Sequence, residues 1–167
     1  MRSSYSESTS MPLSIERREI EGIGIFDLRG RVVVGPEATE LREALSRAAA
    51  TPNPNLILNF EQVHFIDSTG LGTLVVGHSL IKQAGGALKL LNLSKRSAQL
   101  LILTKLSTVF EIFNDEQDAI NSFFPDREVK RFDILEFVTS AENENAPAGK
   151  QESQISETKS RGEREKT

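Results

Sequence analysis

Hydrophobic positions along the chain follow two periods in turn, one typical of strands and one of helices. Short apolar runs bounded by turn residues predict buried strands, most clearly at 55–60 and 87–91. Between 38 and 48, alanine and leucine recur at helical spacing behind Pro36, a residue that suits the first turn of a helix. The two patterns alternate as far as residue 124, so strands and helices are predicted to alternate over this part of the chain.

This alternation predicts an α/β domain over residues 13–124, in the order βββ-α-β-α-β-α-β-α. The predicted strands are 15–20, 23–28, 29–34 (a strand or an extended loop), 55–60, 87–91 and 109–113. The predicted helices are 36–48, 68–84, 94–105 and 114–124. We expect a mixed, mostly parallel β-sheet of four to five strands with about four helices, and a hairpin turn at Glu21-Gly22.

The composition changes on both sides of this domain. Residues 1–12 are rich in serine and are predicted to be a flexible lead-in, while 140–167 hold a single large aliphatic residue, Ile155. Such a segment cannot bury enough surface to offset its ordering entropy, so a disordered C-terminal tail is predicted. Residues 125–139 are a more apolar extension, and the pattern leaves their fold open.

Charge and composition exclude several classes of function. The chain has 20 basic and 24 acidic side chains and a formal net charge of −4, which argues against nucleic acid as the main partner. It has no cysteine, and so no disulfide, thiolate metal site or cysteine nucleophile. No stretch approaches the roughly 20 apolar residues that span a bilayer. We expect a cytoplasmic protein with no direct membrane contact, and nothing in the sequence demands more than a monomer.

One polar turn, Asp67-Ser68-Thr69-Gly70, follows within a few residues of the end of a buried strand and stands where a helix begins. Asp67 stands where a helix N-cap belongs, and Ser68 then opens the helix. Free backbone N–H groups and the helix dipole favour negative charge there. Ser68 is therefore predicted to be a phosphorylation site, with Thr69 as a secondary candidate and the glycines leaving the turn open to a kinase.

The same residues have plainer interpretations. Asp, Ser, Thr and Gly are common at ordinary helix starts. A hydrolase triad could be imagined from Ser68, His64 and Asp67, but no Gly-x-Ser-x-Gly elbow surrounds the serine. His64 and His78 are the only histidines, which is too few for a metal site without further ligands, and we assign them packing or surface roles. No catalytic residue, metal or cofactor is predicted.

From about Leu13 to Phe124 the chain resembles the STAS domain of bacterial anti-sigma factor antagonists, a SpoIIAA-like fold. The resemblance rests on four pieces: Gly30 leading into 41–44, 56–63 followed by 66–72, 85–93, and 103–106 followed by 109–113. The most specific piece is Asp-Ser-Thr-Gly-Leu-Gly at 67–72, directly after the strand.

The resemblance implies a partner-switching cycle. The unphosphorylated antagonist binds an anti-sigma factor that is itself a GHKL-type serine kinase, and the sigma factor is released. The kinase phosphorylates the serine that matches Ser68, the complex dissociates, and a PP2C-type phosphatase reverses the modification. The antagonist itself would catalyse nothing. The expected partner-binding residues are Asp67, Ser68, Thr69, Gly70, Leu71, Gly72, Thr73 and Val76.

The chain also departs from the family pattern. Many relatives carry an acidic residue shortly after the glycine that matches Gly30, where this chain has three valines, 32–34. An alternative function is therefore a scaffold or accessory STAS module, as in lipid-transport ABC systems, whose serine is not phosphorylated. Val76 and Leu80 either form an apolar docking patch beside Ser68 or pack under a neighbouring helix.

Overall fold

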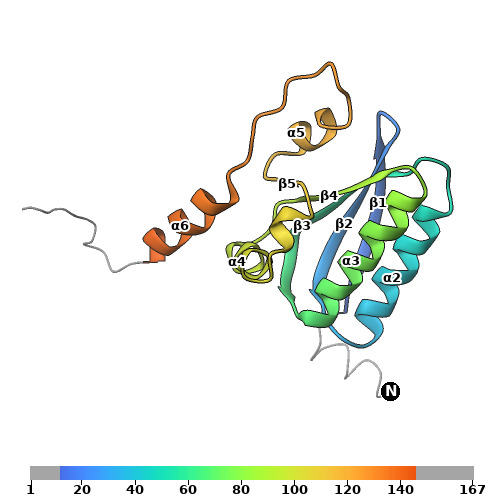
Figure 1. Cartoon of the computed structure of the whole chain (residues 1–167). Coiled ribbons are helices and arrows are strands. Elements are labelled where there is room, and N and C mark those ends of the chain that lie inside the picture. Colours follow the sequence, from blue (N-terminus) through green and yellow to red (C-terminus); the bar gives the residue numbers. More distant parts are fainter. Residues whose placement is uncertain (1–11, 146–167) are drawn as a thin grey trace, which may run out of the picture. The chain divides into compact units, whose positions relative to one another are not determined.

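The computed structural model describes residues 12–145 and confirms the expected α/β fold class (Figure 1). Five strands form one sheet in the order β1-β2-β3-β4-β5. Their bounds are β1 (Ser14–Ile20), β2 (Ile23–Val32), β3 (Asn55–Ile66), β4 (Ala87–Leu91) and β5 (Ile112–Phe113). The helices of the same unit are α2 (Pro36–Ala49), α3 (Ser68–Gln83), α4 (Lys95–Leu103), the 3-10 turn η1 (Leu106–Thr108) and α5 (Glu116–Asn121).

The sheet is mixed and mostly parallel, as expected. β1 pairs with β2 in an antiparallel hairpin, and β2, β3, β4 and β5 run parallel to one another. The hairpin turns at Glu21 and Gly22, which both have positive φ, the conformation that tight hairpin turns require. The predicted hairpin is therefore confirmed.

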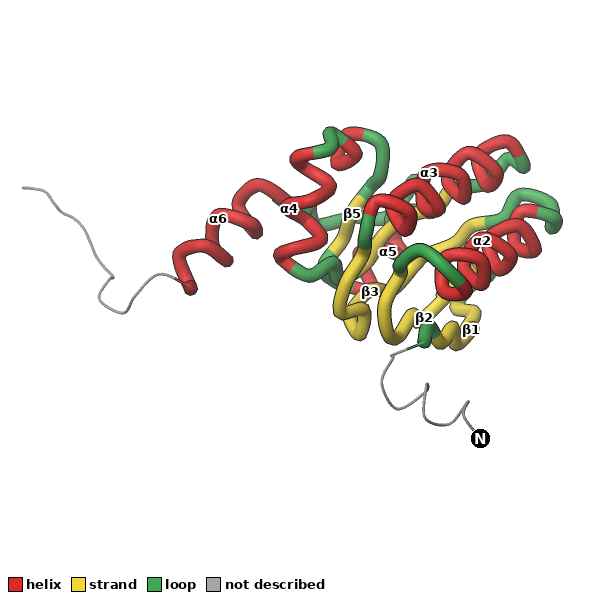
Figure 2. Tube along the Cα trace, turned by 90° about the horizontal axis from the view of Figure 1, so that it is seen from below, coloured by secondary structure: helices red, strands yellow, loops and turns green. Residues whose placement is uncertain are grey.

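Helices cover the two faces of the sheet unequally. α2 and α3 lie side by side over one face, as the two views agree (Figures 1 and 2). On the other face, Ala119 and Ile120 of α5 pack into a buried apolar cluster with strand residues such as Ile23 and Ile57. The sheet is thus a central layer whose two faces each bury apolar side chains.

Two strands differ from the prediction. The predicted strands 23–28 and 29–34 are one strand, β2, which passes through register shifts near Gly30 and ends at Val32. Gly30 has φ 114°, so the strand bends at a bulge and then continues. β3 runs to Ile66 rather than Phe60, because it keeps pairing with the extended β2 although its second half is mostly polar.

The elements after β4 are shorter than predicted. α4 ends at Leu103 and is followed by η1, so the predicted strand 109–113 retains only its last two residues. Lys105 between the two helices has φ 65°, a left-handed conformation that stops the helix. The sequence of residues 114–117 predicts a capping box at the beginning of α5. The cap of α5 lies one residue later, since the Asp115 side chain accepts a hydrogen bond from the Asp118 N–H.

The chain divides into two compact units, the first ending at Phe132. The second contains helix α6 (Ile134–Asn145), which Asp133 caps by accepting a hydrogen bond from the Glu136 N–H at 3.1 Å. The helix thus begins inside the predicted extension and runs six residues into the segment predicted to be disordered. A capped helix propagates cheaply once it has nucleated, which composition alone does not reveal. Residues 1–11 and 146–167 of the predicted lead-in and tail lie outside the described residues.

No helix in the described part of the chain combines the length and apolarity that crossing a membrane requires.

Candidate functional site

The polar turn with the predicted phosphorylation site, residues 67–70, lies where two parallel strands end. We call it the switch turn. Val32 of β2 pairs with Ile66 of β3, and the Asp67 N–H donates to the Val32 carbonyl oxygen at 3.3 Å. The chain then turns directly into α3 at Ser68. Asp67 therefore stands between the end of the sheet and the beginning of a helix of 16 residues.

Asp67 is the N-cap of α3, as predicted. Its Oδ1 accepts a hydrogen bond from the Gly70 N–H at 2.8 Å, and its Oδ2 accepts one from the Val34 N–H at 3.0 Å. Partial burial acts to raise the pKa of this carboxyl, but the backbone donors of Val34, Gly70 and Thr69 outweigh it and lower the pKa. The carboxylate is therefore ionised at neutral pH, and it joins the β2–α2 loop to the beginning of α3.

Ser68 is exposed and is the first residue of α3. Within residues 12–145, its hydroxyl forms no hydrogen bond. The side chain is therefore open to solvent and has no role in holding the turn together. The helix dipole would partly offset the charge of a phosphoryl group at this position.

Gly70 differs from the expectation that it leaves the turn open. It is buried, and a Cβ at this position would collide with the Val32 carbonyl oxygen and crowd the Val32 and Ile66 side chains. Gly70 thus allows α3 to begin in close contact with β2. Gly72 does meet the expectation, because a Cβ there would have no neighbour within 4 Å.

The eight predicted partner-binding residues separate by burial. Ser68, Thr69, Gly72 and Val76 are exposed, Asp67 is half-buried, and Gly70, Leu71 and Thr73 are buried. A partner can touch the first group directly, whereas the buried three shape the surface from beneath. Val76 is 37% exposed and Leu80 is half-buried, so Val76 is the accessible member of the predicted apolar pair.

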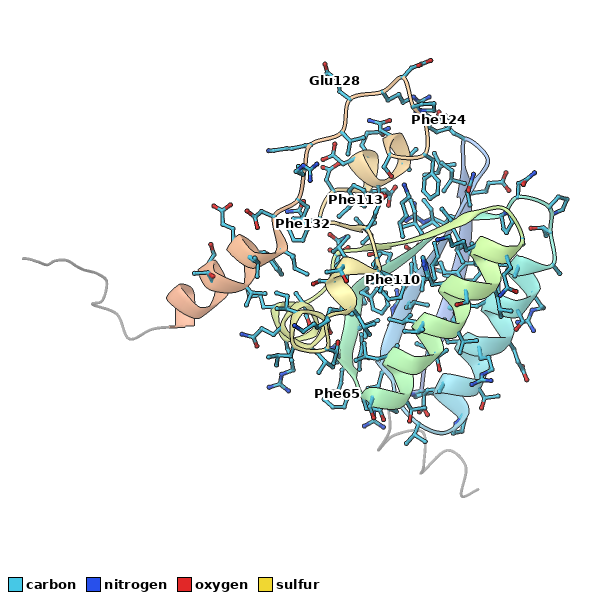
Figure 3. The ribbon with its side chains drawn as sticks, viewed as in Figure 1. Phe65, Phe110, Phe113, Phe124, Glu128 and Phe132 are labelled. Atoms are coloured by element: carbon cyan, nitrogen blue, oxygen red, sulfur yellow. The ribbon has the colours of Figure 1, made fainter. Side chains whose placement is uncertain are left out.

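The sequence-based prediction missed Val34, which it placed in a strand or extended loop. The structure places it in the β2–α2 loop, 65% exposed and hydrogen-bonded through its backbone to Asp67. The dipeptide Gly35-Pro36 was the signal in the sequence that the chain turns there. In the structure Gly35 has φ 113°, which favours glycine. A second exposed apolar residue, Phe65, lies at the same end of the sheet (Figure 3).

The two histidines have surface and packing positions. His64 is exposed, and His78 packs edge-on against Phe110 with ring centroids 5.2 Å apart. Among the described residues, no three His, Cys, Asp or Glu side chains gather closely enough to hold a metal ion. Two cavities, of about 300 and 480 Å³, are lined by residues outside the switch turn.

Comparison with known proteins places this turn in a wider context. Residues 14–119 match the family model described as STAS domain. Over 102 residues the chain is 39% identical to the anti-sigma-B factor antagonist of Bacillus subtilis (strain 168), covering 61% of this chain and 92% of that protein. It is 31% identical over 107 residues to the anti-sigma-B factor antagonist of Listeria monocytogenes, covering 64% and 92%. A crystal structure of an anti-sigma factor antagonist from Mycobacterium paratuberculosis shares the fold, with TM-score 0.59, 20% identity, and coverage of 68% and 97%.

Proposed function

The chain belongs to the STAS domain family, and from this premise we propose that it is an anti-sigma factor antagonist whose activity is switched off by phosphorylation of Ser68. One observation carries the proposal. In a chain 39% identical to an antagonist, the serine after the N-cap aspartate is exposed, and its hydroxyl forms no hydrogen bond within residues 12–145. Such a hydroxyl is free to be modified without loss of an internal contact.

The switch works through charge. Unphosphorylated Ser68 presents a neutral hydroxyl, and the anti-sigma factor docks over it and releases its sigma factor. A phosphoryl group adds about −1.5 to −2 charges at neutral pH. It does so beside the Asp67 carboxylate, which is itself negatively charged and can donate no hydrogen bond to the phosphate. A dianion without a partner in the interface is costly to desolvate, so the complex dissociates.

This cycle implies two enzymes that act on the chain, which itself remains ligand and substrate. The kinase is the anti-sigma factor, of GHKL type, and a PP2C-type phosphatase removes the phosphate. All three would meet in the cytoplasm. The exposed Thr69 is the secondary candidate for modification.

The first test is to incubate the full chain with candidate GHKL-type anti-sigma factor kinases and ATP, and to map the modified residue by mass spectrometry. We expect one phosphate, on Ser68, and none on a Ser68→Ala variant. Thr69→Ala is the matched control and should be phosphorylated as the wild type is. Phosphate on Thr69 alone would contradict the assignment of Ser68.

Binding of the same kinase then tests the switch itself. An uncompensated buried charge costs on the order of 3 kcal/mol, so Ser68→Asp should bind more than about tenfold more weakly than Ser68→Ala. Equal affinities would contradict a charge-based switch. The scaffold alternative, in which the serine is never phosphorylated, instead predicts no phosphate transfer from any cognate kinase.

A further inference from the structure

Val34 is an apolar side chain held in solvent at a fixed place. It is 65% exposed, and among the large hydrophobic residues of the first unit only Leu103, at 79%, is described as more exposed. Its backbone N–H donates to Asp67 Oδ2 at 3.0 Å. In the same peptide group, the Val33 carbonyl oxygen accepts from the Ala38 N–H of α2 at 3.0 Å, and beyond Val34 the Gly35 carbonyl oxygen accepts from the Thr39 N–H at 3.2 Å. The loop is therefore tied on both sides of Val34.

The tie places Val34 beside the residue that precedes Ser68. Asp67 binds the Val34 N–H with one carboxylate oxygen and the Gly70 N–H with the other. The loop and the first turn of α3 therefore keep a constant relation to each other. Val34 is thus an ordered apolar anchor, and such a side chain loses little conformational entropy when a partner covers it.

The exposed face of α3 next to this anchor carries no ionised group. Ser68, Gly72 and Val76 are exposed and four residues apart, so they share one stripe of the helix. From Ser68 to Ile81 the one titratable side chain is His78, which packs on Phe110. The neighbouring helix α2 differs, since its exposed positions include Glu40, Arg42, Glu43 and Arg47. In a chain of which 26% is charged, this uncharged stripe is a local property.

We infer that Val34 is a specificity-determining contact, and that the anti-sigma factor kinase covers it with an apolar pocket while the same partner surface lies over Ser68, Gly72 and Val76. This inference rests on the proposed function, and it deepens it by stating the chemistry of the partner's surface. We call these four residues the switch surface. The four residues are uncharged, and the nearby Asp67 carboxylate is half-buried and bonded to backbone N–H groups, so the surface is desolvated at little cost when it docks. These residues offer a phosphoryl group no cation, so one modification changes the affinity strongly.

The experiment uses the full chain and a purified GHKL-type anti-sigma factor kinase that binds the wild type in the presence of ADP. Dissociation constants are measured by calorimetry for Val34→Asp, Val34→Lys and Val34→Ala. Both charged variants should weaken binding by more than about tenfold, because each leaves a charge unpaired in an apolar pocket. The affinity of Val34→Ala should lie between those of the charged variants and that of the wild type. The wild-type affinity should change little between low and high salt, because the contact is apolar.

Leu103→Asp is the matched control, since it places the same charge at another exposed apolar position. It should bind as the wild type does, and all variants should keep the wild-type thermal unfolding midpoint. Tighter binding by either charged Val34 variant, or binding equal to that of Leu103→Asp, would overturn the inference and leave the phosphorylation switch standing. If the wild type bound no such kinase, the proposed function would fall, and this inference with it.

Discussion

Two glycines near the switch, Gly70 and Gly72, have opposite surroundings within one helical turn. Gly70 faces the Val32 carbonyl oxygen so closely that no Cβ fits, whereas the space beside Gly72 is open. The first is required by packing between α3 and β2. The second is exposed and lies on the surface that we propose meets the partner.

Replacement of each glycine by alanine should therefore change stability in opposite directions. Gly70→Ala forces α3 away from β2 and should destabilise the fold by about 1–3 kcal/mol, as overpacking does. Gly72→Ala removes backbone freedom from the unfolded chain and should stabilise the helix by roughly 0.5–1 kcal/mol. Urea unfolding followed by circular dichroism gives both free energies. A neutral Gly70→Ala would mean that the close approach to Val32 is not required.

Single residues also show which features can be predicted from neighbouring sequence and which cannot. Asp67 and Ser94 were predicted as helix caps and they are, because a cap depends on residues within one turn of it. For α5 a capping box from Asn114 to Gln117 was predicted, and the cap is one residue later, at Asp115. The burial of Gly70 could not be predicted, because it depends on Val32, which is distant in sequence and becomes its neighbour only when the sheet forms.

At the scale of the element, α3 joins the switch to the interior along its whole length. One face of the helix is buried through residues such as Leu74 and Ile81, while the face with Ser68 and Val76 is open. Between the two, His78 packs against Phe110, and its Nδ1 is buried without a partner in the part of the chain described. A buried imidazole nitrogen of this kind favours the neutral ring.

The stability of the fold should consequently depend on His78 at acidic pH. Burial, together with the nearby Lys82 charge, lowers the pKa of His78 below its ordinary 6.5. As the pH falls below about 6.5, His78 becomes protonated in the unfolded chain but stays neutral in the folded chain. The free energy of unfolding therefore decreases. His78→Gln should reduce this decrease between about pH 7 and pH 5. Urea titrations at several pH values test it, and His64→Gln controls for the loss of a histidine.

If His78→Gln and wild type lost stability in parallel as the pH fell, the burial of the imidazole would not be the cause. A carboxylate such as Asp67, whose pKa is also lowered, loses its contribution only at more acidic pH. The two effects can therefore be separated by the range of pH in which each occurs.

Elements differ in how well their sequence pattern defines them. α2 and α3 were predicted to within about one residue at each end, because their apolar spacing and their start and stop residues agree. The apolar run that predicts β3 stops at Phe60, because Glu61 and Gln62 are polar, and pairing with the bulged β2 keeps the chain extended as far as Ile66. β5 was predicted too long, because Val109 is exposed and Phe110 packs against His78, so only Ile112 and Phe113 form the strand.

At the scale of the whole molecule, the two faces of the sheet are covered unequally. The face opposite α2 and α3 is buried by one short helix, α5. The helix α5 has six residues, yet Ala119 and Ile120 complete the cluster that buries Ile23, Ile25 and Ile57. Arg18 of β1 also contacts Glu116 at 2.8 Å, an exposed pair that adds little. Apolar burial is thus the main contribution of α5.

Two shortened chains separate α5 from α6. A chain ending at Phe132 keeps the whole first unit and should unfold cooperatively with a midpoint close to that of the full protein. A chain ending at Asn114 exposes the cluster, and each large apolar side chain freed contributes about 1.5–3 kcal/mol, so it should be largely unfolded. Thermal unfolding by circular dichroism distinguishes them. A folded chain ending at Asn114 would show that α5 is dispensable.

The hydroxyl of Ser68 forms no bond inside the described fold, and this has an evolutionary consequence. Folding requires no contact of this hydroxyl, so we expect a serine to be kept at this position only where a kinase or a binding partner requires it. Substitutions at residue 68 in descendants of this chain should therefore record the gain or loss of a signalling pathway while the architecture stays unaltered.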